Sequence, residues 1–301
     1  MEKIIIIAGP TASGKSALAI DVAKKLDTEI ISADSMQIYK GMDIGTAKIT
    51  KDEMDGIKHH MLDVVNPNEE YSVSDYADEA KGIIDALHKQ NKIPVICGGT
   101  GLYIDALLYP LSLGAHDDSV RLRLEQECEK YGPIYMHDKL KAIDPQEADK
   151  VHYNNVKRVL RALEIYELTG QTKSEQTDRC KDLNYDTLLV VLNPDRNCLY
   201  ERINKRVDIM FESGLENEIQ NLLSNGLTFD CQSMQAIGYK EFKDYFDGKL
   251  TKDELVDEIK KGSRHYAKRQ ITWFKRYPFA RFYDINEKEN ILKDIDEFIR
   301  K

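Results

Sequence analysis

The stretch that most restricts the fold of this chain is its beginning, where an apolar run is followed by a glycine-rich loop. Residues 4–8 are IIIIA, and residues 9–16 are GPTASGKS. The run has the length and β-branched composition of a buried strand. The loop matches the pattern G-x-x-x-x-G-K-[ST], and Leu18, Val22 and Leu26 then recur at the four-residue spacing of a helix. Strand, loop and helix in this order predict a phosphate-binding loop.

Each residue type in this loop suits the binding of an anion. Gly9 and Gly14 permit a tight backbone whose amide groups point inward, and the following helix presents its positive end. Lys15 supplies a cation, and the Ser16 hydroxyl could bind Mg²⁺ on phosphate oxygens. The pattern does not specify which polyphosphate binds. The predicted phosphate site consists of Gly9, Pro10, Thr11, Ala12, Ser13, Gly14, Lys15 and Ser16.

The first hundred residues alternate between strand-like and helical segments, which indicates an α/β fold with a parallel sheet covered on both faces. From about residue 116 to residue 185 the pattern is helical and charged, with breaks at 132–133, 144–145 and 170. We therefore expect an α/β core of residues 1–115 and 186–301 and an inserted helical subdomain of residues 116–185. A helix is expected over 199–223. Strands are expected at 4–8, 29–32, 60–64, 93–97, 187–192 and 280–285.

Residues that directly follow strands are site candidates, because ligands of open parallel sheets bind outside the carboxyl ends of the strands. Asp34 follows the second strand, and the sequence GGTG at 98–101 follows the fourth. Asp34 could act as a general base, bind Mg²⁺ or cap the next helical turn. The glycines could allow close approach of a ligand or form a tight turn. Arg202 and Arg206, one helical turn apart, could form surface ion pairs or reach the phosphate site.

The chain carries a net charge of −9, which excludes non-specific coating of nucleic acid. Two local basic faces nevertheless favour contact with a phosphate backbone over a merely solvated surface. One lies on the helix that contains Arg158 and Arg161, and the other lies in residues 260–276, which hold seven Lys or Arg and no acid. Five cysteines without C-x-x-C spacing argue against a zinc site or a disulfide framework. We expect a cytoplasmic monomer with no membrane segment.

Six segments, in the same order, resemble the bacterial tRNA dimethylallyltransferase family. The resemblance covers nearly the whole chain and implies a fold like that of P-loop NTPases. The segments are residues 9–16 (GPTASGKS), 32–48 (SADSMQIYKGMDIGTAK), 98–103 (GGTGLY), 158–164 (RVLRALE), 236–241 (AIGYKE) and 267–274 (AKRQITWF).

The resemblance implies transfer of the dimethylallyl group of dimethylallyl diphosphate to N6 of the adenosine 3′ of the tRNA anticodon. Lys15, Ser16 and Mg²⁺ would stabilise the departing diphosphate, assisted by Thr11 and Arg206. Asp34 would orient the amine and accept its proton. The inserted helices would hold the anticodon stem-loop. The residues expected to contact tRNA are Asp34, Ser35, Met36, Gln37, Thr100, Arg121, Arg158, Val159, Leu160, Arg161 and Ala162, with Arg264, Lys268 and Arg269 of the basic helix.

Three alternatives remain at this stage. A P-loop kinase of a small molecule would turn over ATP and need no RNA. A prenyltransferase acting on free adenine nucleotides would not need two basic faces. A non-enzymatic RNA-binding module would leave the phosphate loop, Asp34 and the Gly98 turn without a common purpose.

Overall fold

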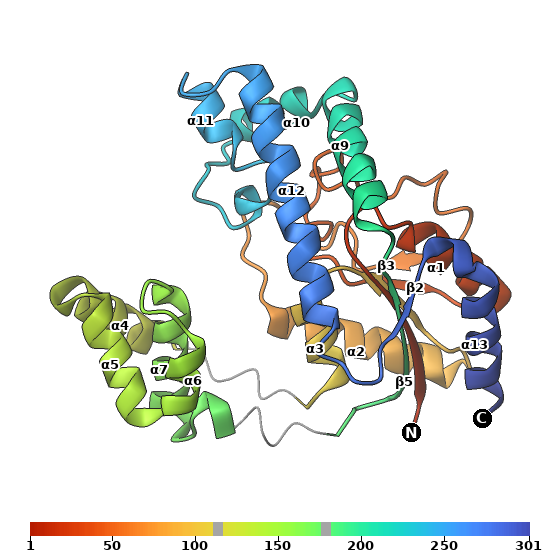
Figure 1. The fold of residues 1–301 in the computed structure, drawn as a ribbon, viewed down its shortest axis with the longest axis horizontal. Coiled ribbons are helices and arrows are strands. Elements are labelled where there is room, and N and C mark those ends of the chain that lie inside the picture. Colours follow the sequence, from red (N-terminus) through yellow and green to blue (C-terminus); the bar gives the residue numbers. More distant parts are fainter. Residues whose placement is uncertain (111–116, 176–181) are drawn as a thin grey trace. The chain divides into compact units, whose positions relative to one another are not determined.

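A computed structural model describes residues 1–110, 117–175 and 182–301. Within these ranges, which Figure 1 draws in colour, six strands form one parallel sheet in the order β3-β2-β4-β1-β5-β6. The predicted α/β fold with a parallel sheet is therefore confirmed. The strands are β1 (Lys3–Ala8), β2 (Ile30–Ser32), β3 (His59–His60), β4 (Val95–Gly98), β5 (Asp186–Leu192) and β6 (Arg281–Tyr283).

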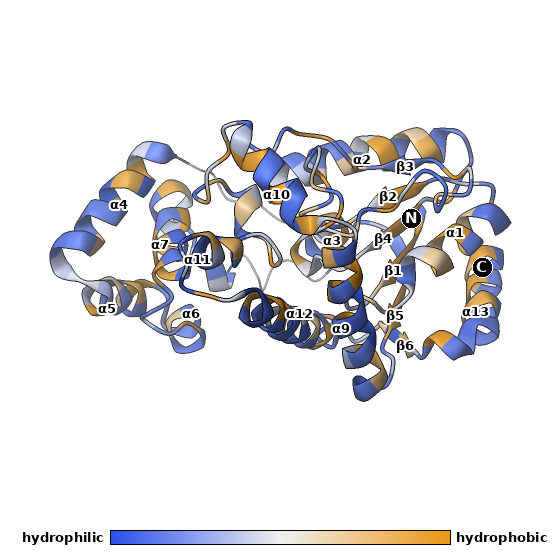
Figure 2. Cartoon of the chain, turned by 90° about the horizontal axis from the view of Figure 1, so that it is seen from above, coloured by the Kyte–Doolittle hydropathy of each residue, from blue (hydrophilic) through white to orange (hydrophobic). Residues whose placement is uncertain are grey.

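Strand β1 is central, and its residues Ile4 to Ala8 are buried, as its apolar sequence predicts. Ile5 pairs in parallel register with Val95 of β4 and with Leu188 of β5. Successive side chains of a strand point to opposite faces, so one face of β1 carries Ile5 and Ile7. These two pack in a cluster with residues of helices α1 and α13. Figure 2 shows α1 and α13 on one side of the sheet and α3 on the other, so both faces are covered.

Contacts divide the described chain into two units, Met1–Leu107 with Tyr185–Lys301, and Leu108–Asn184. The expected boundaries were 115/116 and 185/186. The helices of the first unit are α1 (Lys15–Lys25), α2 (Val73–Lys89), α3 (Gly101–Leu108), α9 (Arg196–Glu212), α10 (Leu215–Ser224), α11 (Phe242–Phe246), α12 (Lys252–Phe274) and α13 (Lys288–Arg300), with 3-10 turns η1 (Ser233–Gln235) and η2 (Ile285–Glu287).

The second unit is helical and has its own apolar core, which includes Leu124, Leu140 and Leu163. The predicted breaks mark the ends of its helices, because proline suits the first turn of a helix and left-handed glycine suits the end. Gly170, at φ 68°, follows the helix Val156–Thr169. The helices are α4 (Asp118–Tyr131), α5 (Pro133–Ile143), α6 (Pro145–Lys150) and α7 (Val156–Thr169).

Two expected elements were wrong. The expected helix over 199–223 is two helices, because Gly214, at φ 96°, stands between α9 and α10 in the left-handed region that stops a helix. The expected strand over 60–64 is limited to β3. Met61 and Asp63 have φ angles of 61° and 52°, which are incompatible with an extended strand. The remaining strands begin and end within two residues of the expected positions.

The cysteines and the membrane prediction can be compared with the described residues. Cys97, Cys128, Cys198 and Cys231 are free thiols, and Cys180 lies outside the described residues. Among the residues that the structure describes, no helix combines the length and apolar character that crossing a membrane requires.

Candidate active site

The loop between β1 and α1 has the backbone that its glycines predict. Gly9, Ala12 and Gly14 have φ angles of 147°, 62° and 90°. A Cβ at Gly9 would stand 2.8 Å from the carbonyl oxygen of Leu192, so this position has no room for a side chain. Helix α1 begins at Lys15 without a side-chain cap or an acidic residue in its first turn, as far as the described residues show. Its amide groups are therefore available to an anion.

A cavity of about 370 Å³ lies at the carboxyl ends of the strands, next to this loop. Its wall includes Lys15 and Ser16 of the loop, Asp34 after β2 and Arg206 of α9. Lys15 donates a hydrogen bond to the carbonyl oxygen of Pro10 at 3.2 Å. Burial lowers the pKa of Lys15 and that of Arg206, and the charge of Asp34 opposes both shifts. Two cations thus face one carboxylate in a largely desolvated space.

Asp34 takes the capping role that its sequence position allowed and keeps one oxygen available. Its Oδ1 accepts hydrogen bonds from the backbone N–H of Met36 at 2.9 Å and of Gln37 at 3.4 Å, so it caps the following turn. The other oxygen, Oδ2, accepts no hydrogen bond from the residues that the structure describes. One carboxylate oxygen therefore fixes the orientation of the group, while the second remains available to a ligand in the cavity.

Of Arg202 and Arg206 on α9, only Arg206 lines the cavity. Its Nη2 donates to the carbonyl oxygen of Thr46 at 3.1 Å, which holds the guanidinium against the loop after β2. Arg202, one turn earlier, is exposed. Arg206 therefore reaches the cavity beside the phosphate loop, whereas Arg202 lies on the surface.

The glycines at 98–101 have a role that neither sequence alternative included. A Cβ at Gly98 would stand 2.2 Å from the carbonyl oxygen of Ala33, and one at Gly99 would stand 2.1 Å from Nε2 of Gln270. At Gly101 it would stand 2.2 Å from the ring of Trp273. The glycines therefore let the loop after β2 and helix α12 pack directly against this turn.

Two side chains of α12 at the cavity, Tyr266 and Gln270, had no role in the sequence analysis. Burial, followed by the charge of Asp34, raises the pKa of Tyr266 to about 12, so its phenol is neutral at neutral pH. Their helical spacing is the sequence feature that could have predicted their place at the cavity. Four residues apart, they share the face opposite Lys268.

Three of the positions expected to contact tRNA lie in the core of the helical unit. Val159, Leu160 and Ala162 are 1%, 1% and 2% exposed and pack in its apolar cluster. Their side chains are enclosed by apolar neighbours and face away from any ligand at the surface, so tRNA contact at these positions would have to involve the backbone and stays a prediction. The three side chains form part of the buried face of α7.

The arginines of the same unit form ion pairs within it. Arg158 lies 3.0 Å from a carboxylate oxygen of Glu147, and Arg161 lies 2.9 Å from one of Glu164. Arg121 pairs with Glu125 at 2.7 Å. Part of the positive charge of this basic face is therefore neutralised locally.

The outer face of α12 forms a basic groove with an aromatic member. Arg276 lies over the ring of Trp273, with its guanidinium carbon 3.9 Å from the ring centroid. Arg264 donates to Oδ1 of Asn204 at 2.6 Å, whereas Lys268 and Arg269 are exposed. Arg269 also lines the cavity, so groove and cavity adjoin. The groove is lined by His265, Lys268, Arg269, Thr272, Trp273 and Arg276.

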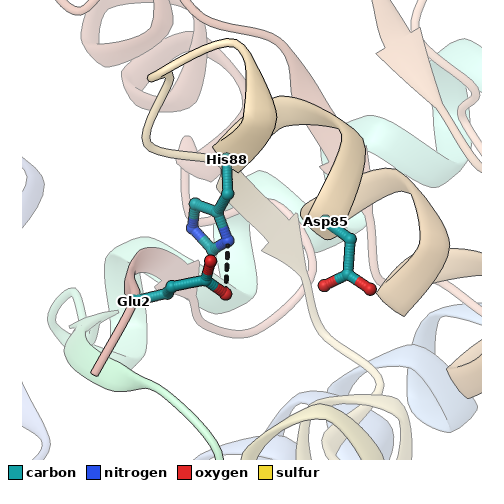
Figure 3. A group of neighbouring side chains, drawn as sticks. All are labelled: Glu2, Asp85 and His88. Atoms are coloured by element: carbon teal, nitrogen blue, oxygen red, sulfur yellow. Dashed lines mark ion pairs between the residues drawn. The ribbon is translucent and has the colours of Figure 1, made fainter.

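A separate polar group, Glu2, Asp85 and His88, is the one cluster of possible metal ligands found among the described residues (Figure 3). His88 donates from Nε2 to the carbonyl oxygen of Lys3 at 2.8 Å, and its Nδ1 lies 3.1 Å from Glu2. The group lies at the amino end of β1, at the opposite edge of the sheet from the phosphate loop. Both carboxylates are exposed, and pairing with the histidine explains the arrangement without a metal ion.

The sheet, the loop after β1 and the convergence of Lys15, Asp34 and Arg206 on one cavity define an α/β protein of the P-loop class. The sequence also identifies the family within this class. Residues 37–277 match the model of the family described as IPP transferase, and the chain belongs to this family.

The most similar relatives include the tRNA dimethylallyltransferases of Caldanaerobacter subterraneus subsp. tengcongensis and Bacillus cytotoxicus. The first is 48% identical over 99% of this chain and 97% of its own length, and the second is 48% identical over 96% and 92%. The solved structure of the Bacillus halodurans tRNA isopentenylpyrophosphate transferase matches with a TM-score of 0.76 at 43% identity, covering 100% of this chain and 97% of that chain. A eukaryotic dimethylallyltransferase acting on tRNA matches with a TM-score of 0.79 at 35% identity, covering 91% and 70%.

Proposed function

We propose that this chain transfers the dimethylallyl group of dimethylallyl diphosphate to N6 of the adenosine 3′ of the anticodon in tRNA. The bond between C1 of the dimethylallyl group and the diphosphate oxygen breaks, and a bond between C1 and N6 forms. Diphosphate and one proton of the amine leave. The observation that supports the proposal is the single cavity that brings together Lys15, Arg206 and Asp34, in a chain whose relatives are named for this reaction.

In this proposal the phosphate loop holds the diphosphate and stabilises its developing charge. Amide groups at the start of α1 and the cations of Lys15 and Arg206 face the leaving oxygen, and Thr11 lines the same wall. The hydroxyl of Ser16 is an oxygen donor at the start of α1 in this cavity, and it suits Mg²⁺ with diphosphate oxygens and water as the further ligands. When bound, Mg²⁺ would neutralise charge on the diphosphate.

The free oxygen of Asp34 is proposed to orient the adenine amine and accept its proton. The exocyclic amine of adenine is a weak nucleophile, so a fixed carboxylate favours attack as positive charge develops on nitrogen. The target base has to leave its stack to enter the cavity, as bases do in other enzymes that modify them. Ser35 is fixed beside Asp34, because its N–H donates to Oγ1 of Thr100 at 3.0 Å.

A transfer assay tests the proposed function. Radiolabelled dimethylallyl diphosphate and Mg²⁺ are incubated with the protein and unmodified tRNA, with free AMP in one parallel reaction and ATP alone in another. We expect label in tRNA only, lost when EDTA is added. Label in AMP would favour a prenyltransferase of free nucleotides, and hydrolysis of ATP without transfer would favour a kinase.

We further propose that tRNA binds along the basic groove of α12. Replacing Lys268 with alanine is expected to weaken tRNA binding and to reduce the slope of log Kd against log salt concentration by about one, because one phosphate contact is lost. The measurement is a filter-binding or fluorescence titration at several salt concentrations. The control is Lys288→Ala, since Lys288 lies on α13 and pairs with Asp21. Equal slopes for Lys268→Ala and the wild type would remove Lys268 from the interface.

A further inference from the structure

We propose that Gln270 is a positioning residue that fixes the phosphate loop relative to the loop that carries Asp34. The inference rests on the proposed function and extends it to a side chain of α12. Gln270 is 5% exposed and lines the cavity, although it comes from a helix more than 200 residues beyond both loops.

The amide of Gln270 bridges the phosphate loop and the turn after β4, which contains Gly99, with one hydrogen bond to each. Its Oε1 accepts from the backbone N–H of Thr11 at 3.0 Å, and its Nε2 donates to the carbonyl oxygen of Gly99 at 2.9 Å. The amide suits this bridge because it accepts on one side and donates on the other, whereas an ionised carboxylate only accepts and a methionine thioether cannot donate. Both partners are backbone groups, so the bridge fixes the course of the chain itself.

The turn that contains Gly99 also holds both chain neighbours of Asp34. The N–H of Thr100 donates to the carbonyl oxygen of Ala33 at 3.0 Å, and Oγ1 of Thr100 accepts from the N–H of Ser35 at 3.0 Å. A continuous set of hydrogen bonds therefore runs from Thr11, through Gln270 and the turn, to the residues on either side of Asp34. In the proposed reaction, this set fixes the distance between the leaving diphosphate and the base.

The absence of a side chain at residue 99 supports the same conclusion. A Cβ there would stand 2.1 Å from Nε2 of Gln270, so the amide occupies the space that a side chain would take. Gly99 is thus required by the bridge.

The test replaces Gln270 with methionine, which keeps the length of the side chain, and with glutamate, which keeps only the acceptor. Three quantities are measured: the single-turnover rate with both substrates saturating, the affinity for inorganic pyrophosphate and the affinity for tRNA. We expect the rate to fall about a hundredfold, the usual effect of misplacing reacting groups by about 1 Å. Pyrophosphate affinity falls about fivefold to tenfold as the loop loses a hydrogen bond, and tRNA affinity is unchanged.

The matched control is Gln232→Met. Gln232 makes the same pair of hydrogen bonds to a backbone, both with Tyr71 at 3.1 Å, but does not line the cavity. This variant is expected to retain the wild-type rate. A wild-type rate in folded Gln270→Met would overturn the proposal, as would equal losses of rate and of tRNA affinity, which indicate a general structural role.

A second variant, Gly99→Ala, displaces the amide without removing it and is expected to reproduce the selective loss of rate. It keeps the proposal testable if Gln270→Met does not fold. Pyrophosphate binding is measured without any acceptor, so it tests the bridge even if the wild type transfers no label to tRNA. If the wild type transferred no label to tRNA, that result would contradict the proposed function but not the bridge made by Gln270.

Discussion

Replacing Asp34 with asparagine is expected to lower the single-turnover rate of dimethylallyl transfer by about 10²–10⁴-fold, the usual contribution of a general base. Asparagine keeps an oxygen in the position of Oδ1, which accepts from the backbone N–H of Met36, so the turn should persist. The group that replaces Oδ2 can no longer accept a proton from the amine. The measurement is a rapid-quench experiment with enzyme in excess over labelled tRNA.

The control for this variant is Asp296→Asn, because Asp296 pairs with Lys25 on the surface at 2.6 Å. Affinity for tRNA should stay at the wild-type value in both variants. A wild-type rate in Asp34→Asn would exclude the proton-accepting role and leave the carboxylate as a cap of its turn.

Replacing Arg206 with methionine is expected to lower the same rate by about 10²–10³-fold, as the loss of one preorganised donor does in other enzymes. The guanidinium lines the cavity and is held by the carbonyl oxygen of Thr46. Without it, charge on the departing diphosphate would face a desolvated wall with one cation fewer. Single-turnover kinetics and pyrophosphate affinity are measured together, and both should fall.

Arg202→Met is the matched control, because Arg202 lies one turn away on the same helix and is exposed. It should retain the rate and the pyrophosphate affinity of the wild type. Equal effects of the two substitutions would indicate that the charge of α9 acts through the general field of the protein and that Arg206 has no specific contact.

The parts of the molecule that could be predicted from the sequence are those whose structure is determined by residues close together in the chain. β1, the phosphate loop and α1 are contiguous, so their apolar run, glycines and helical spacing specify the local structure. The candidate Asp34 followed from its place directly after a strand, because parallel strands bring their carboxyl ends to one edge. The alternation of strands and helices likewise predicted a parallel sheet, but it did not predict the order of the strands.

The parts that the sequence did not predict depend on packing between distant segments. Gln270 contacts Thr11 and Gly99, and no pattern of spacing connects residues so far apart in the chain. The reason for Gly101 is likewise the ring of Trp273. The burial of three side chains within residues 158–162 was missed for a different reason. The prediction treated a helical stretch as a whole, although an amphipathic helix alternates between surface and core, and Val159 lies in the core.

The interrupted order of the chain has a consequence for how it folds. Central strand β1 lies between β4 and β5, and β5 begins only at residue 186. Pairing of β1 with β5 must therefore close a loop that contains the whole of Leu108–Asn184, and such long-range pairing is slow. During synthesis the helical unit, whose contacts are local, can fold first, because β1 cannot pair with β5 until β5 has been synthesised. The order in which the ribosome releases the chain thus favours folding of the insertion before that of its host.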